Sequence, residues 1–213
     1  MSFIPDTATI LAFTLAAFVL AITPGPDMTL QISRALSSGR AAAFACGFGA
    51  FVGIAVHTLL VAFGVSALVV ASPTAFLILK FGGAGYLLIL AFQAIRTGSS
   101  FNVTVTKAEK RSLTGHFLQG LTVNLINPKV ILFFMTFLPQ FVAATDPAIT
   151  GKLIFLGFFM IVVSLPVLAA IVLGAHGLSE WLKRRPGVMR AVDWLFASVF
   201  SVFALRILFT QSR

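Results

Sequence analysis

Two charged residues stand beside proline-containing breaks in otherwise apolar sequence, and they are the first candidates for chemistry. Asp27 closes the run TPGPD at residues 23–27, and Lys129 closes the run NPK at residues 127–129. An ionisable side chain within an apolar span costs a few kcal/mol to bury, so it is a functional candidate by default. A carboxylate and an ammonium can bind substrate, carry a proton, or form a structural ion pair that clamps two segments together.

The prolines beside these charges predict interrupted helices. A proline inside a membrane helix frees a backbone carbonyl, which is tolerated only where protein or water can satisfy it. Thr23 and Asn127 directly precede Pro24 and Pro128, the arrangement in which a capping side chain starts a new helix. We therefore expect each motif to end one half-helix and begin another, whose N-terminal N–H groups and dipole favour a carboxylate.

Polar residues repeat around both breaks. Thr23, Asp27 and Gln31 are spaced four apart and would line one helix face, with Asn124 and Asn127 opposite them. Such side chains also serve as packing contacts between membrane helices, and that alternative stays open. The predicted substrate-binding or coupling residues are Thr23, Pro24, Gly25, Pro26, Asp27, Gln31, Asn124, Asn127, Pro128 and Lys129.

The composition is that of an integral membrane protein. Of 213 residues, 59% are hydrophobic and 10% are charged, and the mean hydropathy is +1.04, which is too apolar for a soluble domain. The apolar blocks are about 20 residues or longer and lack the alternation of a membrane barrel, so the predicted class is all-α. Six transmembrane helices are expected, near residues 7–33, 41–70, 74–96, 116–142, 150–175 and 191–210.

The basic residues predict the orientation of these spans. Ten lie in or beside the first, third and fifth connections, against four on the other side. The positive-inside rule places those connections in the cytoplasm and both termini in the periplasm. The net charge of +9 is then mostly this signal, directed at anionic lipid of the bilayer rather than at nucleic acid.

The one long polar connection divides the chain into two halves. Residues 1–96 hold three spans, residues 97–115 form a cytoplasmic linker, and residues 116–213 hold three more. Because each half has an odd number of spans, the second enters the membrane from the opposite side. We therefore predict a 3+3 inverted repeat with broken first and fourth helices, and Pro128 follows Pro26 by 102 residues.

Several function classes find no support in the sequence. A single cysteine, Cys46, excludes an internal disulfide or a CxxC redox pair. The three histidines lie on separate spans or loop edges, and Asp27 is the one deep carboxylate, so we expect no metal, no cofactor and no enzyme activity. No GxxxxGKS signature is present, so we expect energy from a gradient or a partner.

The chain resembles the lysine exporter superfamily, in particular its homoserine/threonine exporter branch. The resemblance rests on TPGPD, GRAAAFACGFGAFVGIAVH, KFGGAGYLLILAFQAIR and GLTVNLINPKVILFFMTFLPQFV, which cover most of residues 1–142. It implies proton-driven export of amino acids or their derivatives, such as homoserine, homoserine lactone or threonine, across a bacterial inner membrane, often by a homodimer. Asp27 and Lys129 match the acidic and basic positions after the two proline motifs of that family.

Two functions remain open at this stage. The leading one is secondary active export, in which the two halves move around a fixed midplane site while a proton exchanges for substrate. The alternative is a passive channel lined by the same broken helices, or an exporter of another small zwitterionic or anionic solute.

Reporter fusions test the predicted topology. We expect a C-terminal alkaline phosphatase fusion to be active and a C-terminal fluorescent-protein fusion to be dark, because the basic residues place both termini outside the cytoplasm. The opposite pair of results would overturn the topology and, with it, the inverted repeat inferred from the odd number of spans per half.

Overall fold

The computed structural model describes residues 3–97, 111–143 and 145–210, and these residues are helical with no strand among them. Most of the predicted linker, including Lys107 and Lys110, lies outside the described residues. The helices are α1 Thr7–Ile22, α2 Pro26–Ser37, α3 Arg40–Ala71, α4 Pro73–Thr97, α5 Leu113–Leu125, α6 Pro128–Leu132, α7 Ile149–Arg184 and α8 Pro186–Thr210. A π-helical turn, η1 Phe133–Phe137, and a 3-10 turn, η2 Leu138–Phe141, continue α6.

Both predicted breaks are confirmed. The α1–α2 pair bends by 52° and the pair formed by α5 and residues 128–141 bends by 53°, each across a break of four residues or fewer. Thr23 and Asn127 adopt extended backbone before their prolines, because the proline ring disfavours the helical region for the residue that precedes it. Pro26 and Pro128 each occupy the first turn of the following helix, where the missing N–H group costs nothing.

The expected caps are right at one break and wrong at the other. Asn127 caps α6, and its side-chain oxygen accepts a hydrogen bond from the backbone N–H of Lys129 at 3.1 Å. Thr23 does not cap α2. It ends α1 instead, where its hydroxyl donates to the carbonyl of Val19 at 2.6 Å, and α2 begins after Gly25 with no side-chain cap. The second proline in TPGP delays the start of α2 and so removes Thr23 from the capping position.

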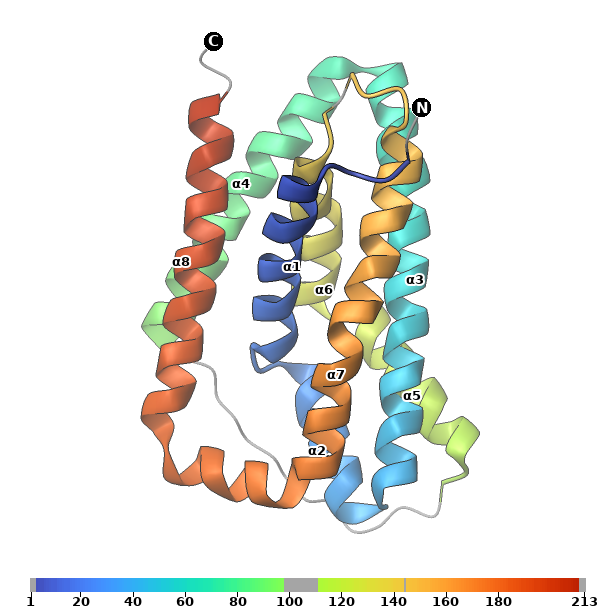
Figure 1. The fold of residues 1–213 in the computed structure, drawn as a ribbon, viewed down its shortest axis with the longest axis vertical. Coiled ribbons are helices and arrows are strands. Elements are labelled where there is room, and N and C mark those ends of the chain that lie inside the picture. Colours follow the sequence, from blue (N-terminus) through green and yellow to red (C-terminus); the bar gives the residue numbers. More distant parts are fainter. Residues whose placement is uncertain (1–2, 98–110, 144, 211–213) are drawn as a thin grey trace.

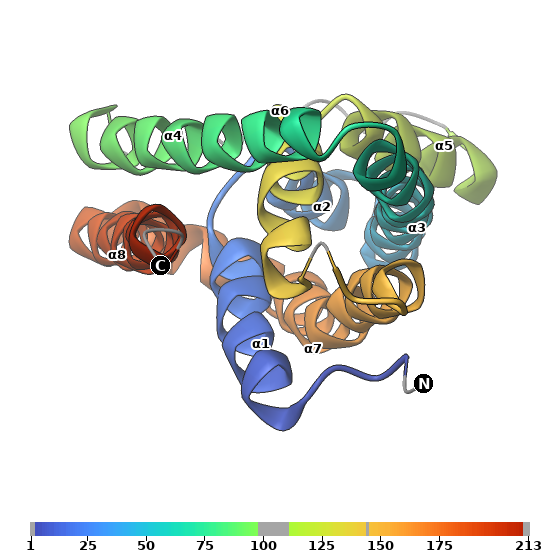
Figure 2. The same cartoon turned by 90° about the horizontal axis from the view of Figure 1, so that it is seen from above.

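The helices form an upright bundle with a splayed pair at one side. α1 begins and α8 ends at the same end of the bundle, whereas the α2–α3 and α7–α8 connections lie at the opposite end (Figure 1). α4 packs mainly against α8, away from the group formed by α1, α2, α3, α5 and α7 (Figure 2).

Three helices of the described residues are long and apolar enough to cross a membrane, and these are residues 40–68, 149–182 and 187–205. The number of spans rises to five if each bent pair is one span. The predicted boundaries agree within a few residues except where α7 meets α8. α7 runs to Arg184, past the expected end at residue 175, because nothing in the polar segment breaks the helix before Pro186.

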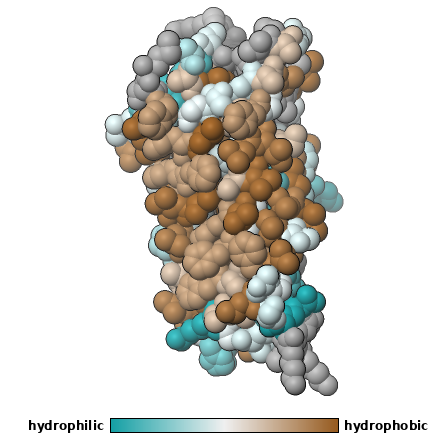
Figure 3. Space-filling model, turned by 90° about the vertical axis from the view of Figure 1, so that its right-hand side faces the viewer, coloured by the Kyte–Doolittle hydropathy of each residue, from teal (hydrophilic) through white to brown (hydrophobic). Residues whose placement is uncertain are grey.

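The outer surface is suited to lipid. Apolar residues cover the middle of one face, and hydrophilic residues gather toward its two ends (Figure 3). Large apolar side chains stand exposed along the helices, including Leu60 at 65%, Ile78 at 69% and Val202 at 65%. An apolar surface of this extent is stable only against a bilayer or a partner.

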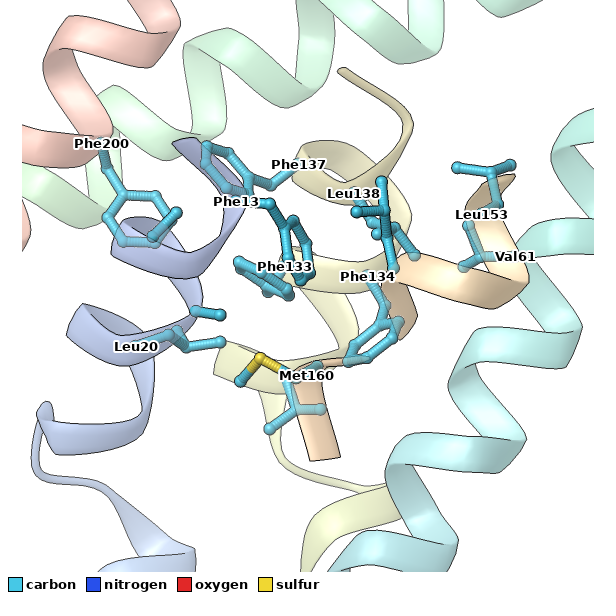
Figure 4. Close-up of a cluster of buried hydrophobic side chains, with 14 of the residues drawn as sticks. Phe13, Leu20, Val61, Phe133, Phe134, Phe137, Leu138, Leu153, Met160 and Phe200 are labelled. Atoms are coloured by element: carbon cyan, nitrogen blue, oxygen red, sulfur yellow. The ribbon is translucent and has the colours of Figure 1, made fainter. Parts of the chain in front are cut away.

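A cluster of phenylalanines forms the densest part of the core. Phe13 of α1, Phe133, Phe134 and Phe137 of η1, and Phe200 of α8 are each at most 1% exposed, and their rings converge above Leu20 and Met160 (Figure 4). The ring centroids of Phe137 and Phe200 lie 4.8 Å apart. The cluster joins α1, η1 and α8, three segments that are distant in sequence.

Glycines let α3 and α5 approach at backbone distance, which fits the GxxxG of Gly49 and Gly53. A Cβ at Gly49 would collide with the carbonyl of Phe117, and one at Gly120 with the carbonyl of Cys46. At Gly53 a Cβ would lie 2.5 Å from the amide oxygen of Asn124. Backbone cannot move aside as a flexible side chain can, so small residues at this seam set the separation of the two helices.

We expect Gly120→Ala to destabilise the protein by about 1 to 3 kcal/mol, because the added methyl group forces α3 and α5 apart. The measurement is the temperature at which detergent-solubilised protein loses its monodisperse peak. Gly64→Ala is the matched control, since a Cβ there meets nothing within 4 Å. Equal melting temperatures for the two variants would contradict the backbone contact.

Candidate substrate and coupling site

A small cavity lies where the two broken helices meet. Its volume is about 80 Å³, well below the roughly 300 Å³ of ordinary ligand pockets. It is enclosed by the α1–α2 and α5–α6 breaks together with α3 and α7. The polar lining residues are Thr23, Asp27, Gln31, Asn124, Lys129 and Ser164.

Asp27, in the first turn of α2, is held by two amides from the other broken helix. Asn124 Nδ2 donates to one carboxylate oxygen at 3.3 Å, and Asn127 Nδ2 donates to the other. Asn124 and Asn127 are themselves nearly inaccessible, at 2% exposure each. Charge-assisted hydrogen bonds of this kind compensate a buried carboxylate for lost hydration.

Lys129, in the first turn of α6, is held by the end of α1. Its ammonium donates to the carbonyl of Thr23 at 2.7 Å and to that of Leu20 at 3.4 Å. These carbonyls lie in the last turn of α1, whose acceptors have no partners further along the helix. Gly25 makes room for the side chain, because a Cβ there would lie 3.0 Å from Lys129 Nζ.

Each charged side chain is therefore bound by the opposite break. The first break holds the ammonium of the second half, and the second break holds the carboxylate of the first half. Although Asp27 and Lys129 line the same cavity, no ion pair within 4.0 Å joins them in the part of the chain that the structure describes. The hydrogen bonds that each charge makes are with neutral groups of the opposite segment.

The predicted site residues differ in how they relate to the cavity. Thr23, Asp27 and Gln31 line the cavity, although Thr23 belongs to α1 and therefore does not share a helix face with the other two. Gly25 and Asn127 contact the charged side chains directly. Three prolines shape the breaks rather than face this cavity, and these are Pro24, Pro26 and Pro128.

One wall of the cavity was not anticipated from the sequence. α7 contributes Met160, Ser164, Val167, Leu168 and Ile171. A signal for it exists, because Pro166 interrupts the hydrogen bonding of α7 beside these residues. Like the prolines of the two breaks, Pro166 lies inside an apolar span and could have been interpreted in the same way.

His57 of α3 supports the site from outside the cavity. Its Nε2 lies 3.5 Å from the carbonyl of Asn124, and the imidazole donates in this pair. The ring also stacks on Phe134, with centroids 5.8 Å apart. His57 is therefore bonded to the neighbouring helix α5.

The hydrogen-bonding positions that Asp27 and Lys129 leave unused determine which ligands the site can bind. An ammonium has three donors, of which Lys129 uses two on carbonyls, and a carboxylate offers about four acceptor positions, of which Asp27 uses two on amides. Each group can therefore take one further polar ligand of opposite charge. In the described residues no cluster of three histidine, cysteine, aspartate or glutamate side chains could hold a metal ion.

Comparison with known proteins covers almost the whole chain. Residues 18–211 match the family described as LysE type translocator. Homoserine/homoserine lactone efflux proteins of Salmonella typhimurium and Salmonella typhi are each 32% identical over 189 residues, which is 89% of this chain and 90% of theirs. A protein of Vibrio cholerae named "Uncharacterized membrane protein" is 32% identical over 190 residues, 89% of this chain and 91% of its own.

No solved structure matches the chain. The family match and the relatives agree with the resemblance carried by the two proline motifs, and a translocator is a transport protein rather than an enzyme. Because the match over residues 18–211 includes both breaks and the residues that line the cavity, this multi-pass membrane protein belongs to the LysE type translocator family.

Proposed function

We propose that this protein is a secondary active exporter of amino acids or amino-acid derivatives across the bacterial inner membrane, working by proton antiport. The observation that carries the proposal is the cavity between the breaks, which presents one carboxylate and one ammonium with capacity to spare. A zwitterionic amino acid offers the complementary pair of charges. Its ammonium would meet Asp27 and its carboxylate would meet Lys129.

The size of the cavity and the names of the relatives favour a small solute. At about 80 Å³ the cavity admits little beyond the two charged ends of an amino acid unless its walls move. Two similar proteins are named homoserine/homoserine lactone efflux proteins. Homoserine, threonine and similar neutral amino acids are therefore the proposed substrates, together with homoserine lactone, whose ester carbonyl would accept from Lys129 in place of a carboxylate.

Six spans in two inverted halves complete the proposed architecture. The sixth is α4, whose 25 residues reach about 37 Å as a helix, enough to cross the hydrocarbon core. The two breaks bend by nearly the same angle and hold each other's charged residue, as expected of halves related by an inverted repeat. Periplasmic termini, proton coupling and a homodimer belong to the same proposal.

The phenylalanine cluster supports alternating access. Phe13 precedes Leu20 in α1, and Phe133 and Phe137 follow Lys129, so the cluster lies between the cavity and the end of the bundle where α1 begins and α8 ends (Figure 1). Its rings are packed to exclusion of solvent. We propose that this cluster is the closed gate on the periplasmic side, and that the π-helical turn η1 gives it room to rearrange.

Coupling would arise at Asp27. In the proposed cycle a proton occupies Asp27 after the substrate has left, and the ammonium of an arriving substrate replaces that proton. The amides of Asn124 and Asn127 hold the carboxylate in place in both states. The protein would then carry a proton inward for each substrate carried outward.

We expect Asp27→Asn to lose export against a substrate gradient while retaining exchange of substrate between compartments, because the variant keeps the shape but not the titration. Proteoliposomes loaded with homoserine, threonine and homoserine lactone are assayed under a proton gradient, with and without an uncoupler, by mass spectrometry of the released solutes. Asp6→Asn is the matched control, since Asp6 caps α1 outside the cavity and asparagine caps equally well.

Two outcomes of that assay would count against the proposal. Uphill export by Asp27→Asn at the wild-type rate would remove Asp27 from the coupling step. Release by the wild-type protein that only follows the substrate gradient, with no effect of the uncoupler, would indicate the passive channel instead.

The charge-swapped variant Asp27→Lys with Lys129→Asp should remain inactive. A carboxylate at position 129 would face the carbonyl oxygens of Leu20 and Thr23, which cannot donate to it. The same transport assay measures this, alongside both single variants and the wild type. Recovery of activity in the double variant would show that the two residues act as a structural ion pair.

A further inference from the structure

A second hollow, larger than the cavity, opens between the α1–α2 break, α7 and the start of α8. Its volume is about 810 Å³, and all of its lining residues are apolar. It lies toward the end of the bundle where α7 meets α8. Its lining includes Phe18, Pro24, Ile171, Gly177, Trp181 and Met189.

The protein does not fill this groove itself. Gly174 and Gly177 of α7 face it, and a Cβ at either position would meet nothing within 4 Å. A groove without polar lining cannot hold water or a polar solute by hydrogen bonding, and the helices around it are apolar enough to lie in a bilayer. Its walls are therefore suited to an apolar occupant.

Positive charge borders the same end of the groove. Arg184, Arg185 and Arg190 are exposed, and in the sequence each lies within three residues of a lining residue, namely Leu182, Val188 or Met189. Arg184 pairs with Glu180 at 3.5 Å, whereas neither Arg185 nor Arg190 has a carboxylate partner among the described residues. Trp181, 46% exposed, is suited to the interface between hydrocarbon and headgroups.

We propose that the groove binds an acyl chain of an anionic phospholipid whose phosphate is held by Arg185 and Arg190. The hydrocarbon chain matches the apolar walls, and the charge at the mouth selects an anionic headgroup over a zwitterionic one. A helix of a second copy would cover the walls but would leave the two arginines without a counter-charge. The lipid satisfies both parts of the site.

The groove has a bearing on the cavity, because the two share a wall. Met28, Val167 and Ile171 line both hollows. Met28, Ile32 and Ile171 pack together as a small buried cluster, so side chains one layer thick separate the acyl chain from the polar residues. The bound lipid thus supports the wall of the cavity from behind.

Native mass spectrometry of the intact, detergent-solubilised protein tests the proposal. The probes are phosphatidylglycerol and phosphatidylcholine with the same acyl chains. We expect the wild type to retain one phosphatidylglycerol in preference to phosphatidylcholine. Arg185→Gln with Arg190→Gln should reduce that preference about tenfold or more, and Gly177→Leu or Gly174→Leu should reduce retention of both lipids by filling the groove.

Matched controls separate the groove from general effects. Arg96→Gln with Arg111→Gln removes two exposed arginines elsewhere in the protein, and Gly64→Leu places the same side chain on an open helix surface outside the groove. Both should behave as the wild type. Circular dichroism and a monodisperse elution peak establish that each variant is folded. If Gly177→Leu does not fold, Gly174→Leu replaces it as the variant that fills the groove.

Three results would overturn the proposal. One is equal retention of the two lipids by the wild type. Another is undiminished phosphatidylglycerol on folded Gly177→Leu and Gly174→Leu. The third is a change in subunit number in these leucine variants without loss of lipid, which would assign the groove to a second copy of the chain.

Discussion

The binding of each charged side chain by the opposite break is the interaction on which the rest of the structure depends. A carboxylate and an ammonium are both costly to bury, and each is compensated by polar groups that only a broken helix can offer. The carbonyls at the end of α1 receive Lys129, and the amides beside the second break receive Asp27. Neither break would be satisfied alone. The two halves of the chain are therefore tied together at the point where each is weakest.

The surrounding packing serves this arrangement. Glycines bring α3 to backbone distance from α5, which places His57 beside the carbonyl of Asn124. The phenylalanine cluster closes the region beyond Lys129. α7 supplies the remaining wall and, through Met28 and Ile171, divides the polar cavity from the apolar groove.

Much of this was predictable because prolines and buried charges have few permitted environments. The positions of both breaks, the cap at Asn127 and the clustering of Asp27 with Asn124 and Asn127 follow from local rules. The role of Thr23 did not, because two prolines compete to start α2 and the backbone geometry decides between them. The contribution of α7 is tertiary, and no local pattern states which helix closes a cavity. The partner of Lys129 was also missed, since backbone carbonyls carry no sequence signature.

The seam between α3 and α5 has a mechanical meaning. At Gly49 and Gly120 main chain touches main chain, so no side chain is available to change rotamer and let one helix slide past the other. α3 comes from the first half of the sequence and α5 from the second, which makes the seam a fixed strut across the molecule. Any motion that opens the cavity must then pivot elsewhere, in the segments that carry no such contact. In alternating access, the other helices would then move relative to the fixed α3–α5 pair, and the two halves would not rock as rigid bodies.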